Sequence, residues 1–298
     1  MLLRRDSKLS NSLFMRCVAV SEVIVAFALV HVAFRSFKQF TSWGRLETET
    51  GLNFSPGLIM IVLSVTIVAV RRRSFTSYGV TRKSFLHNMN VGIVCLLALL
   101  AGGILLSLTG IRHSPSQIGP FEGSVFAVSA FAVTCAILWA LNKHARLLRQ
   151  VPMAVTLTLA VGFLLVPLVV GFWGDRPYGY VLLTVLWRLF CAGVGEEVFF
   201  RGYIQSRLNE AFGRPCRLLG VQFGMGLIVS SLLFGLVHAL NSVDYFSGSY
   251  TFNWWYGLAT VMFPYGFLRE KTGSVVAPAV THGLLDVLLV VPSLSGAP

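Results

Sequence analysis

Long apolar runs recur along the whole of this 298-residue sequence and are separated by short polar segments. The hydrocarbon core of a bilayer is about 30 Å thick, and roughly 20 helical residues are needed to cross it. Lipid offers no partner for backbone N–H and C=O groups, so runs of this kind cross as helices. Only 12% of the residues are charged, about half the share usual in a soluble domain. The sequence therefore predicts an all-α fold, a polytopic transmembrane helical bundle.

Because each crossing takes roughly 20 residues, we expect about eight or nine spans. The Gly, Pro and charged residues between the runs mark loops, and no long soluble segment interrupts the series. The predicted spans are 13–34, 53–70, 89–110, 125–141, 151–173, 179–200, 218–240, 254–268 and 274–292.

The positive charges indicate how the bundle is oriented. Most of the 24 Lys and Arg residues fall in alternate loops. These loops lie on the same side of the membrane as the N-terminus. Because cytoplasmic loops retain Lys and Arg, we predict an integral multi-pass protein with a cytoplasmic N-terminus and the C-terminus on the opposite side. The net charge of +12 is then mainly a topology signal. It predicts contact with the lipid bilayer and no binding of nucleic acid, since no soluble basic module is available.

Charged residues at membrane depth are costly and need an explanation. The sixth run contains two adjacent acids, Glu196 and Glu197, followed by Arg201. Glu197 and Arg201 are four residues apart, so on a helix they share a face and can neutralise each other. Glu196 faces a different neighbour. Judged from this run alone, it is equally plausible that both carboxylates are solvated at the cytoplasmic end of the span and that neither has a functional role.

Two later runs carry histidines. Phe234 and His238 share a face of the seventh run, and His282 and Asp286 share a face of the last. A single His in an apolar helix is more often a packed, hydrogen-bonded residue than a catalyst. Acid and imidazole groups from three runs, directed toward one interior, favour a functional site.

These residues resemble the motifs of the CAAX-protease and bacteriocin-processing family, also called the ABI family. The resemblance covers roughly residues 179–292. It implies a catalytic membrane core at 151–298 and accessory transmembrane helices at 1–150. The matching motifs are Glu-Glu-x-x-x-Arg (Glu196, Glu197, Arg201), Phe-x-x-x-His (Phe234, His238) and His-x-x-x-Asn/Asp (His282, Asp286).

The family resemblance implies an intramembrane endopeptidase of the glutamic type, with no cofactor. Glu196 would activate water with assistance from His238, while His282 and Asp286 would contribute to the oxyanion site. Glu197, Arg201 and Phe234 would support them. The implied partners are a peptide or protein substrate, including lipidated ones.

Asp286 departs from the family pattern, which more usually has Asn at this position. An ionised Asp accepts hydrogen bonds and donates none, so it cannot stabilise an oxyanion directly. We expect Asp286 instead to orient and charge His282.

The depths of the predicted residues conflict. In straight spans, Glu196 lies nearer the cytoplasmic side than His238 by roughly 10 Å, at about 1.5 Å per residue. Continuation of the sixth helix through Tyr203 to about Ala211 would place Glu196 near its middle and ease the mismatch.

Other chemistries remain as alternatives. Glu and His are zinc ligand types, so a metal-dependent membrane protease is the minority alternative, although no His-Glu-x-x-His occurs. A non-catalytic membrane transporter or scaffold protein could also use a polar interior. Arg16, Glu22, His31 and Arg188 are interpreted as structural pairs or interfacial groups. Trp254, Trp255 and Tyr256 fit an interfacial belt.

Overall fold

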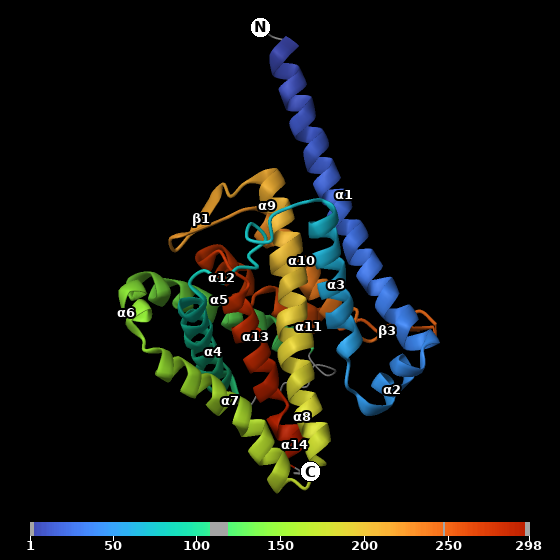
Figure 1. Ribbon diagram of the computed structural model, residues 1–298, viewed down its shortest axis with the longest axis vertical. Helices are drawn as coiled ribbons and strands as arrows, with labels where there is room; N and C mark the ends of the chain where they lie inside the picture. The colour runs from blue at the N-terminus through green and yellow to red at the C-terminus, as the bar shows by residue number, and fades with distance from the viewer. Residues whose placement is uncertain (1–2, 108–118, 247, 296–298) are drawn as a thin grey trace.

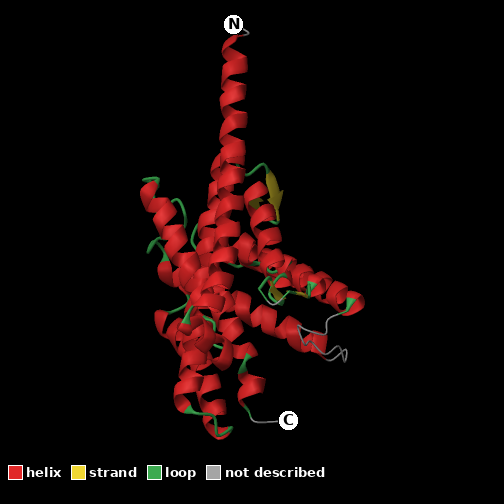
Figure 2. Ribbon diagram, turned by 90° about the vertical axis from the view of Figure 1, so that its right-hand side faces the viewer, coloured by secondary structure: helices red, strands yellow, loops and turns green. Residues whose placement is uncertain are grey.

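The computed structural model describes residues 3–107, 119–246 and 248–295, and this part of the chain forms a helical bundle (Figure 1). Nearly all of the described chain is helical, and the first turns of α1 extend beyond the other helices (Figure 2). Two short antiparallel hairpins, β1–β2 and β3–β4, are the sheets in the described residues. The predicted all-α membrane bundle is confirmed.

The order of the elements follows the predicted spans. The N-terminal half contains α1 (Leu3–Phe40), α2 (Ser42–Thr50), α3 (Phe54–Val70), α4 (Phe85–Ser107), α5 (Pro120–Lys143), α6 (Ala145–Gln150) and α7 (Met153–Trp173). The C-terminal half contains α8 (Tyr178–Leu186), η1 (Trp187–Glu196), η2 (Val198–Gln205), α9 (Ser206–Phe212), β1 (Cys216–Leu218), β2 (Val221–Phe223), α10 (Met225–Ala239), β3 (Val243–Asp244), β4 (Ser249–Tyr250), α11 (Trp254–Val261), α12 (Tyr265–Thr272), α13 (Val276–Leu289) and α14 (Val291–Leu294).

Among the described residues, five helical segments are long and apolar enough to cross a membrane. Shorter apolar helices, α3 and α10, occupy two further predicted spans. The predicted end of the third span at 110 lies outside the described residues. The five long segments are Leu13–Phe40, Phe85–Leu105, Pro120–Lys143, Met153–Trp173 and Val276–Leu294.

Two predicted spans differ from the structure. The seventh begins later than 218, because the β1–β2 hairpin occupies its first residues and α10 starts at Met225. The eighth is broken into α11 and α12, with Pro264 between them. Proline disfavours the helical conformation of the preceding residue and removes a backbone donor, which explains why the run does not continue as one helix.

The sixth span is one long helical rod from α8 through η1 and η2 to α9. Its continuation to about Ala211 agrees with the structure, since α9 ends at Phe212. Its middle is π-helical, a form that is rare and frequent at functional sites. Glu196 and Glu197 lie where η1 and η2 meet.

Close backbone contacts hold this rod against its neighbours. A Cβ atom at Gly193 would overlap the backbone of Gly283 on α13, and one at Gly195 would overlap Gly57 on α3. Small residues at helix interfaces allow this approach in membrane proteins. The functional helices η1 and α13 are therefore fixed by glycine contacts.

The two ends of the bundle carry different connections. The start of α1 and the β1–β2 hairpin lie at one end of the long axis, whereas α14 and the turn between α7 and α8 lie at the other (Figure 1). Which end faces the cytoplasm stays a prediction from the charge distribution.

Substituting Gly193 by Ala tests the contact with α13. The added methyl group meets the Gly283 backbone, and overpacking of this kind costs about 1–3 kcal/mol. We expect a lower melting temperature in detergent. The control is Gly162→Ala on α7, where the methyl group meets nothing within 4 Å and the same gain in helix propensity applies. Equal melting temperatures for the two variants would contradict the tight contact.

Candidate active site

Three helical elements bring the predicted residues together. Glu196 and Glu197 come from the π-helical rod, His238 from α10 and His282 from α13. Helix α13 packs along η1, and α10 packs along η2. The three predicted motifs therefore come together in the interior of the bundle.

The Glu197 carboxylate lies at the centre of this cluster. Its Oε2 atom is 3.4 Å from Arg201 Nε, and its Oε1 atom accepts a hydrogen bond of 3.0 Å from His282 Nδ1. The Glu197 side chain is 0% exposed and that of Arg201 is 1% exposed. A buried charge without a counterion is strongly destabilising. Glu197 thus forms the predicted pair with Arg201, and in addition it joins the rod to α13.

Aromatic rings enclose the guanidinium and the imidazole. The Phe234 ring centroid lies 4.5 Å from Arg201 Cζ and 5.6 Å from the His282 ring. Tyr265 of α12 stacks on His282, with the ring centroids 4.8 Å apart and an interplanar angle of 18°. These contacts fix the plane of the His282 ring, and the supporting role of Phe234 stays a prediction.

Asp286 lies between His282 and Arg188. Its Oδ1 atom lies 3.9 Å from His282 Nε2, and its Oδ2 atom lies 3.3 Å from Nη1 of Arg188. The hydrogen bond of the His282 ring is made to Glu197. Asp286 is therefore within ion-pair distance of His282 without a hydrogen bond to it, and its role in orienting and charging His282 stays a prediction. Arg188, interpreted as a structural residue, is a second counterion for this carboxylate.

His238 is oriented by its own helix. Its Nδ1 atom lies 2.7 Å from the carbonyl oxygen of Phe234, and donation of the Nδ1 proton to that oxygen leaves Nε2 as an acceptor in the neutral ring. The His238 ring packs against Phe234 at 4.5 Å and against Tyr256 at 5.5 Å between centroids. The ring therefore presents Nε2 away from the Phe234 carbonyl.

Glu196 has no such partner. Its Oε2 atom is buried and makes no hydrogen bond within the described part of the chain. Glu196 interacts electrostatically with both His282 and Asp286. Buried polar atoms are usually hydrogen-bonded, and an exception needs a catalytic, strain or solvent explanation. Glu197 Oε2 also lacks a hydrogen bond but lies in the ion pair with Arg201, whereas Glu196 has no ion pair among the described residues and is available to a ligand or water.

Glu196 and His238 share two electrostatic partners. Glu196 and His238 each interact electrostatically with His282 and Asp286. No hydrogen bond joins Glu196 to His238 among the described residues. The two side chains are therefore related through α13, which lies at the centre of the site.

Sequence reasoning missed three side chains at the site. Tyr265 follows the break at Pro264, so its place opposite His282 depends on a turn that periodicity does not reveal. Tyr256 contacts His238 rather than belonging only to an interfacial belt. Arg188 could have been recognised from the sequence as a site residue, because it is a charged residue inside an apolar run.

A second charged network lies beside the site. The Glu22 carboxylate accepts hydrogen bonds from Arg73, from Arg207 Nε at 3.1 Å and from the Tyr203 hydroxyl at 3.0 Å. Tyr203 stacks on Tyr78, and burial raises the pKa of the Tyr78 hydroxyl, which stays protonated as a donor. Helix α1 is therefore attached to the π-helical rod, and Glu22 is structural as interpreted.

Two other polar residues in α1 also have structural contacts. The Arg16 guanidinium lies over the ring of Phe212, 5.5 Å from its centroid. His31 Nε2 lies 3.0 Å from the Tyr245 hydroxyl. Both agree with the interpretation of these residues as structural or interfacial.

The comparisons with known proteins agree with the resemblance seen in the motifs. Residues 178–288 match the family model of the Rce1-like type II CAAX prenyl endopeptidases, and this range contains the motifs that carry the resemblance. A search of curated proteins gave no match, and neither did a search of solved structures. The predicted resemblance to CAAX proteases is confirmed over this range.

Substituting Arg201 by Met tests the buried bridge. Glu197 would keep its charge in an apolar surround, and breaking a buried pair in this way costs about 3–5 kcal/mol. We expect a large fall in the melting temperature of the purified protein. Arg82→Met is the control, because Arg82 is exposed. A fall no larger than that of the control would show that Glu197 does not depend on Arg201.

Proposed function

We propose that this chain is an intramembrane endopeptidase in which Glu196 activates a water molecule for hydrolysis of a peptide bond. The observation that carries the proposal is the buried Oε2 atom of Glu196, which has no hydrogen bond among the described residues, beside a Glu197 that is held by His282 and by the ion pair with Arg201. A general base must have a carboxylate oxygen available to accept a proton from water. The match to a CAAX endopeptidase family supports the same reaction class.

The proposed reaction has two steps. Glu196 accepts a proton from water as the oxygen attacks the substrate carbonyl carbon, and a tetrahedral oxyanion forms. Glu196 then returns that proton to the leaving amine nitrogen as the C–N bond breaks, which yields a new carboxyl terminus and a free amine. His238, with Nε2 as an acceptor, would hold the second proton of the attacking water.

His282 is the proposed oxyanion donor. Its Nδ1 atom donates to Glu197, so Nε2 faces the substrate and can donate to it when the ring is protonated. Fixed donors directed at the developing negative charge are commonly the largest contribution to catalysis. A carboxylate behind an imidazole also stabilises its protonated form, as in serine hydrolases. Glu197 would thus act on the substrate through His282.

Asp286 then needs a role consistent with a nearby oxyanion. An unpaired carboxylate would repel the developing charge, but Arg188 lies 3.3 Å from it and offsets the repulsion. We propose that the ion pair replaces the neutral amide that the family more usually has here. In this proposal Asp286 shapes the site and does not bind the oxyanion.

The proposed substrate is a peptide bond of a protein, with lipidated proteins included. The proposed orientation keeps the N-terminus cytoplasmic and the C-terminus on the opposite side, as the loop charges predict. The proposal also includes a mechanism without metal. Among the described residues, no group of three or more His, Cys, Asp or Glu side chains is arranged to hold an ion.

Substituting Glu196 by Gln tests the base directly. The amide cannot accept the proton from water, so we expect the cleavage rate of a peptide library to fall at least about 100-fold, within the usual range for a general base. Glu49→Gln, an exposed acid on α2, is the control. Undiminished cleavage by Glu196→Gln would overturn the mechanism, and absence of cleavage by the unaltered protein would favour a transporter or scaffold.

Chelators test the metal alternative. We expect dialysis of the active protein against EDTA or 1,10-phenanthroline to leave the cleavage rate unchanged, because the proposed chemistry uses only side chains. Loss of activity that zinc restores would instead support the metal-dependent protease.

A further inference from the structure

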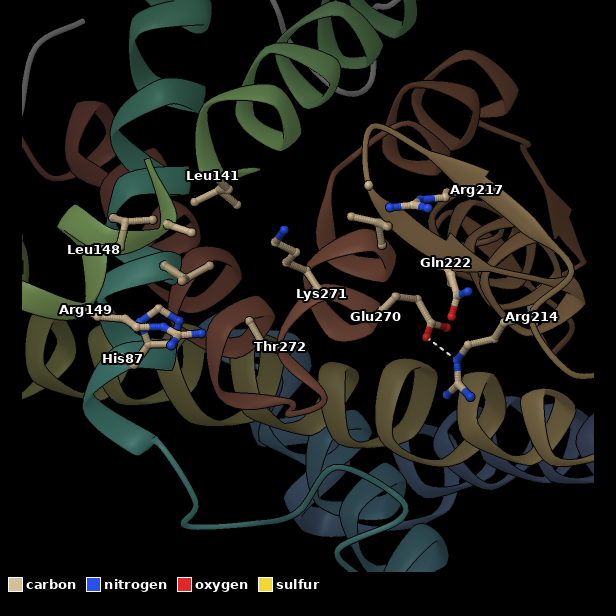
Figure 3. Close-up of a pocket in the computed structure, with 14 residues that line it drawn as sticks. His87, Leu141, Leu148, Arg149, Arg214, Arg217, Gln222, Glu270, Lys271 and Thr272 are labelled. Carbon is tan, nitrogen blue, oxygen red and sulfur yellow. Dashed lines mark hydrogen bonds and ion pairs between the residues drawn. The ribbon is translucent and has the colours of Figure 1, made fainter. Parts of the chain in front are cut away.

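A separate cavity of about 500 Å³ lies between the ends of several helices and the β1–β2 hairpin (Figure 3). Its lining comes from α4, α5, α6, α12 and the hairpin. None of the motif residues of the site lines it. By the charge distribution, this end of the bundle is the predicted cytoplasmic side, where the polar headgroups of lipids lie.

Basic side chains line this cavity along its length. His87 and Arg149 lie together at one end in Figure 3, Arg214 and Arg217 lie at the other, and Lys271 lies between them. Burial and the neighbouring Arg149 favour the neutral form of the His87 imidazole, so the positive charge at this end of the cavity comes from Arg149.

One acid, Glu270, lines the cavity, and it is already saturated. Arg214 Nε donates to Oε2 at 2.6 Å, while Gln205 and Asn209 donate to Oε1 at 2.7 and 2.6 Å. The Glu270 side chain is 2% exposed. It therefore balances Arg214 and leaves the charges of Arg149, Arg217 and Lys271 uncompensated by any acid that lines the cavity.

Part of the remaining wall is apolar. Val91, Leu141, Leu148 and Val221 lie there beside the basic groups, and the polar side chains of Gln222 and Thr272 also line the cavity. A small inorganic anion needs only the charges, whereas an amphiphile at the membrane surface uses both kinds of wall. A volume of about 500 Å³ also exceeds what one phosphate group fills and lies within the range usual for ligand sites.

We propose that this cavity binds the phosphate headgroup of an anionic phospholipid. Basic pockets between transmembrane helices on the cytoplasmic side bind such headgroups. Lys271, which lies between the two ends, would contact the phosphate oxygens, while Arg149 and Arg217 would attract the headgroup from the two ends of the cavity. The apolar wall would contact the glycerol and the first methylenes of the acyl chains. The bound lipid would join α12 to α6 and the hairpin.

The test measures melting temperature of the full chain in detergent with three added probes. These are a short-chain phosphatidylglycerol, the phosphatidylcholine with the same acyl chains, and inorganic phosphate. A ligand that binds the folded state stabilises it by mass action. We expect phosphatidylglycerol to raise the melting temperature by several degrees more than either other probe.

Matched double variants separate the pocket from general surface charge. Arg149→Gln with Lys271→Gln should remove at least half of the phosphatidylglycerol shift. Arg82→Gln with Lys83→Gln removes the same charge from an exposed loop outside the cavity and should preserve the shift. If the pocket variant does not fold, Arg217→Gln on the exposed strand β1 provides the same comparison against Arg82→Gln.

Three outcomes would overturn the proposal. An equal loss of the shift in both double variants would indicate non-specific attraction to anionic lipid. Equal shifts with the two lipids would exclude recognition of a net negative headgroup. An equal shift with inorganic phosphate would assign the cavity to a soluble anion and not to a lipid.

Discussion

The Glu197 carboxylate is the constraint on which the rest of the site depends. It is buried, and it contacts Arg201 within the π-helical rod and His282 on α13. The Phe234 ring on α10 lies against both of these partners, so one anion fixes the relative positions of three helical elements. A charge at this depth is tolerated because it is paired, and pairing also fixes which nitrogen of His282 faces the interior.

The two adjacent acids have different partners. Glu196 and Glu197 are neighbours in sequence, yet among the described residues only Glu197 has both a hydrogen-bond partner, His282, and an ion-pair partner, Arg201. Arg188 forms a similar ion pair with Asp286. Two of the three acids are thus paired with Arg residues, which is why we propose Glu196 as the acid that exchanges a proton with water.

Much of this arrangement could be predicted from the sequence. Apolar run length identified the helices, because a bilayer demands a minimum length and little charge. The four-residue spacing identified the Glu197–Arg201 pair, and the depth mismatch between Glu196 and His238 indicated that the rod continues past Tyr203. What spacing could not reveal were contacts between elements, such as Glu197 with His282. The π-helical geometry, the break at Pro264 and the place of Arg188 opposite Asp286 also depend on tertiary packing, and periodicity carries no information about it.

The central claim is that Glu197 stabilises the fold through its buried pair with Arg201, whereas Glu196 does not. Substituting each acid by its isosteric amide tests this claim most directly. The melting temperatures of Glu196→Gln and Glu197→Gln should be compared in the same detergent. Glu197→Gln leaves Arg201 buried without its counterion, so we predict a fall equivalent to about 3–5 kcal/mol. Glu196→Gln removes a buried charge that has no partner, so we predict no fall. Equal losses in the two variants, or the larger loss in Glu196→Gln, would contradict the account.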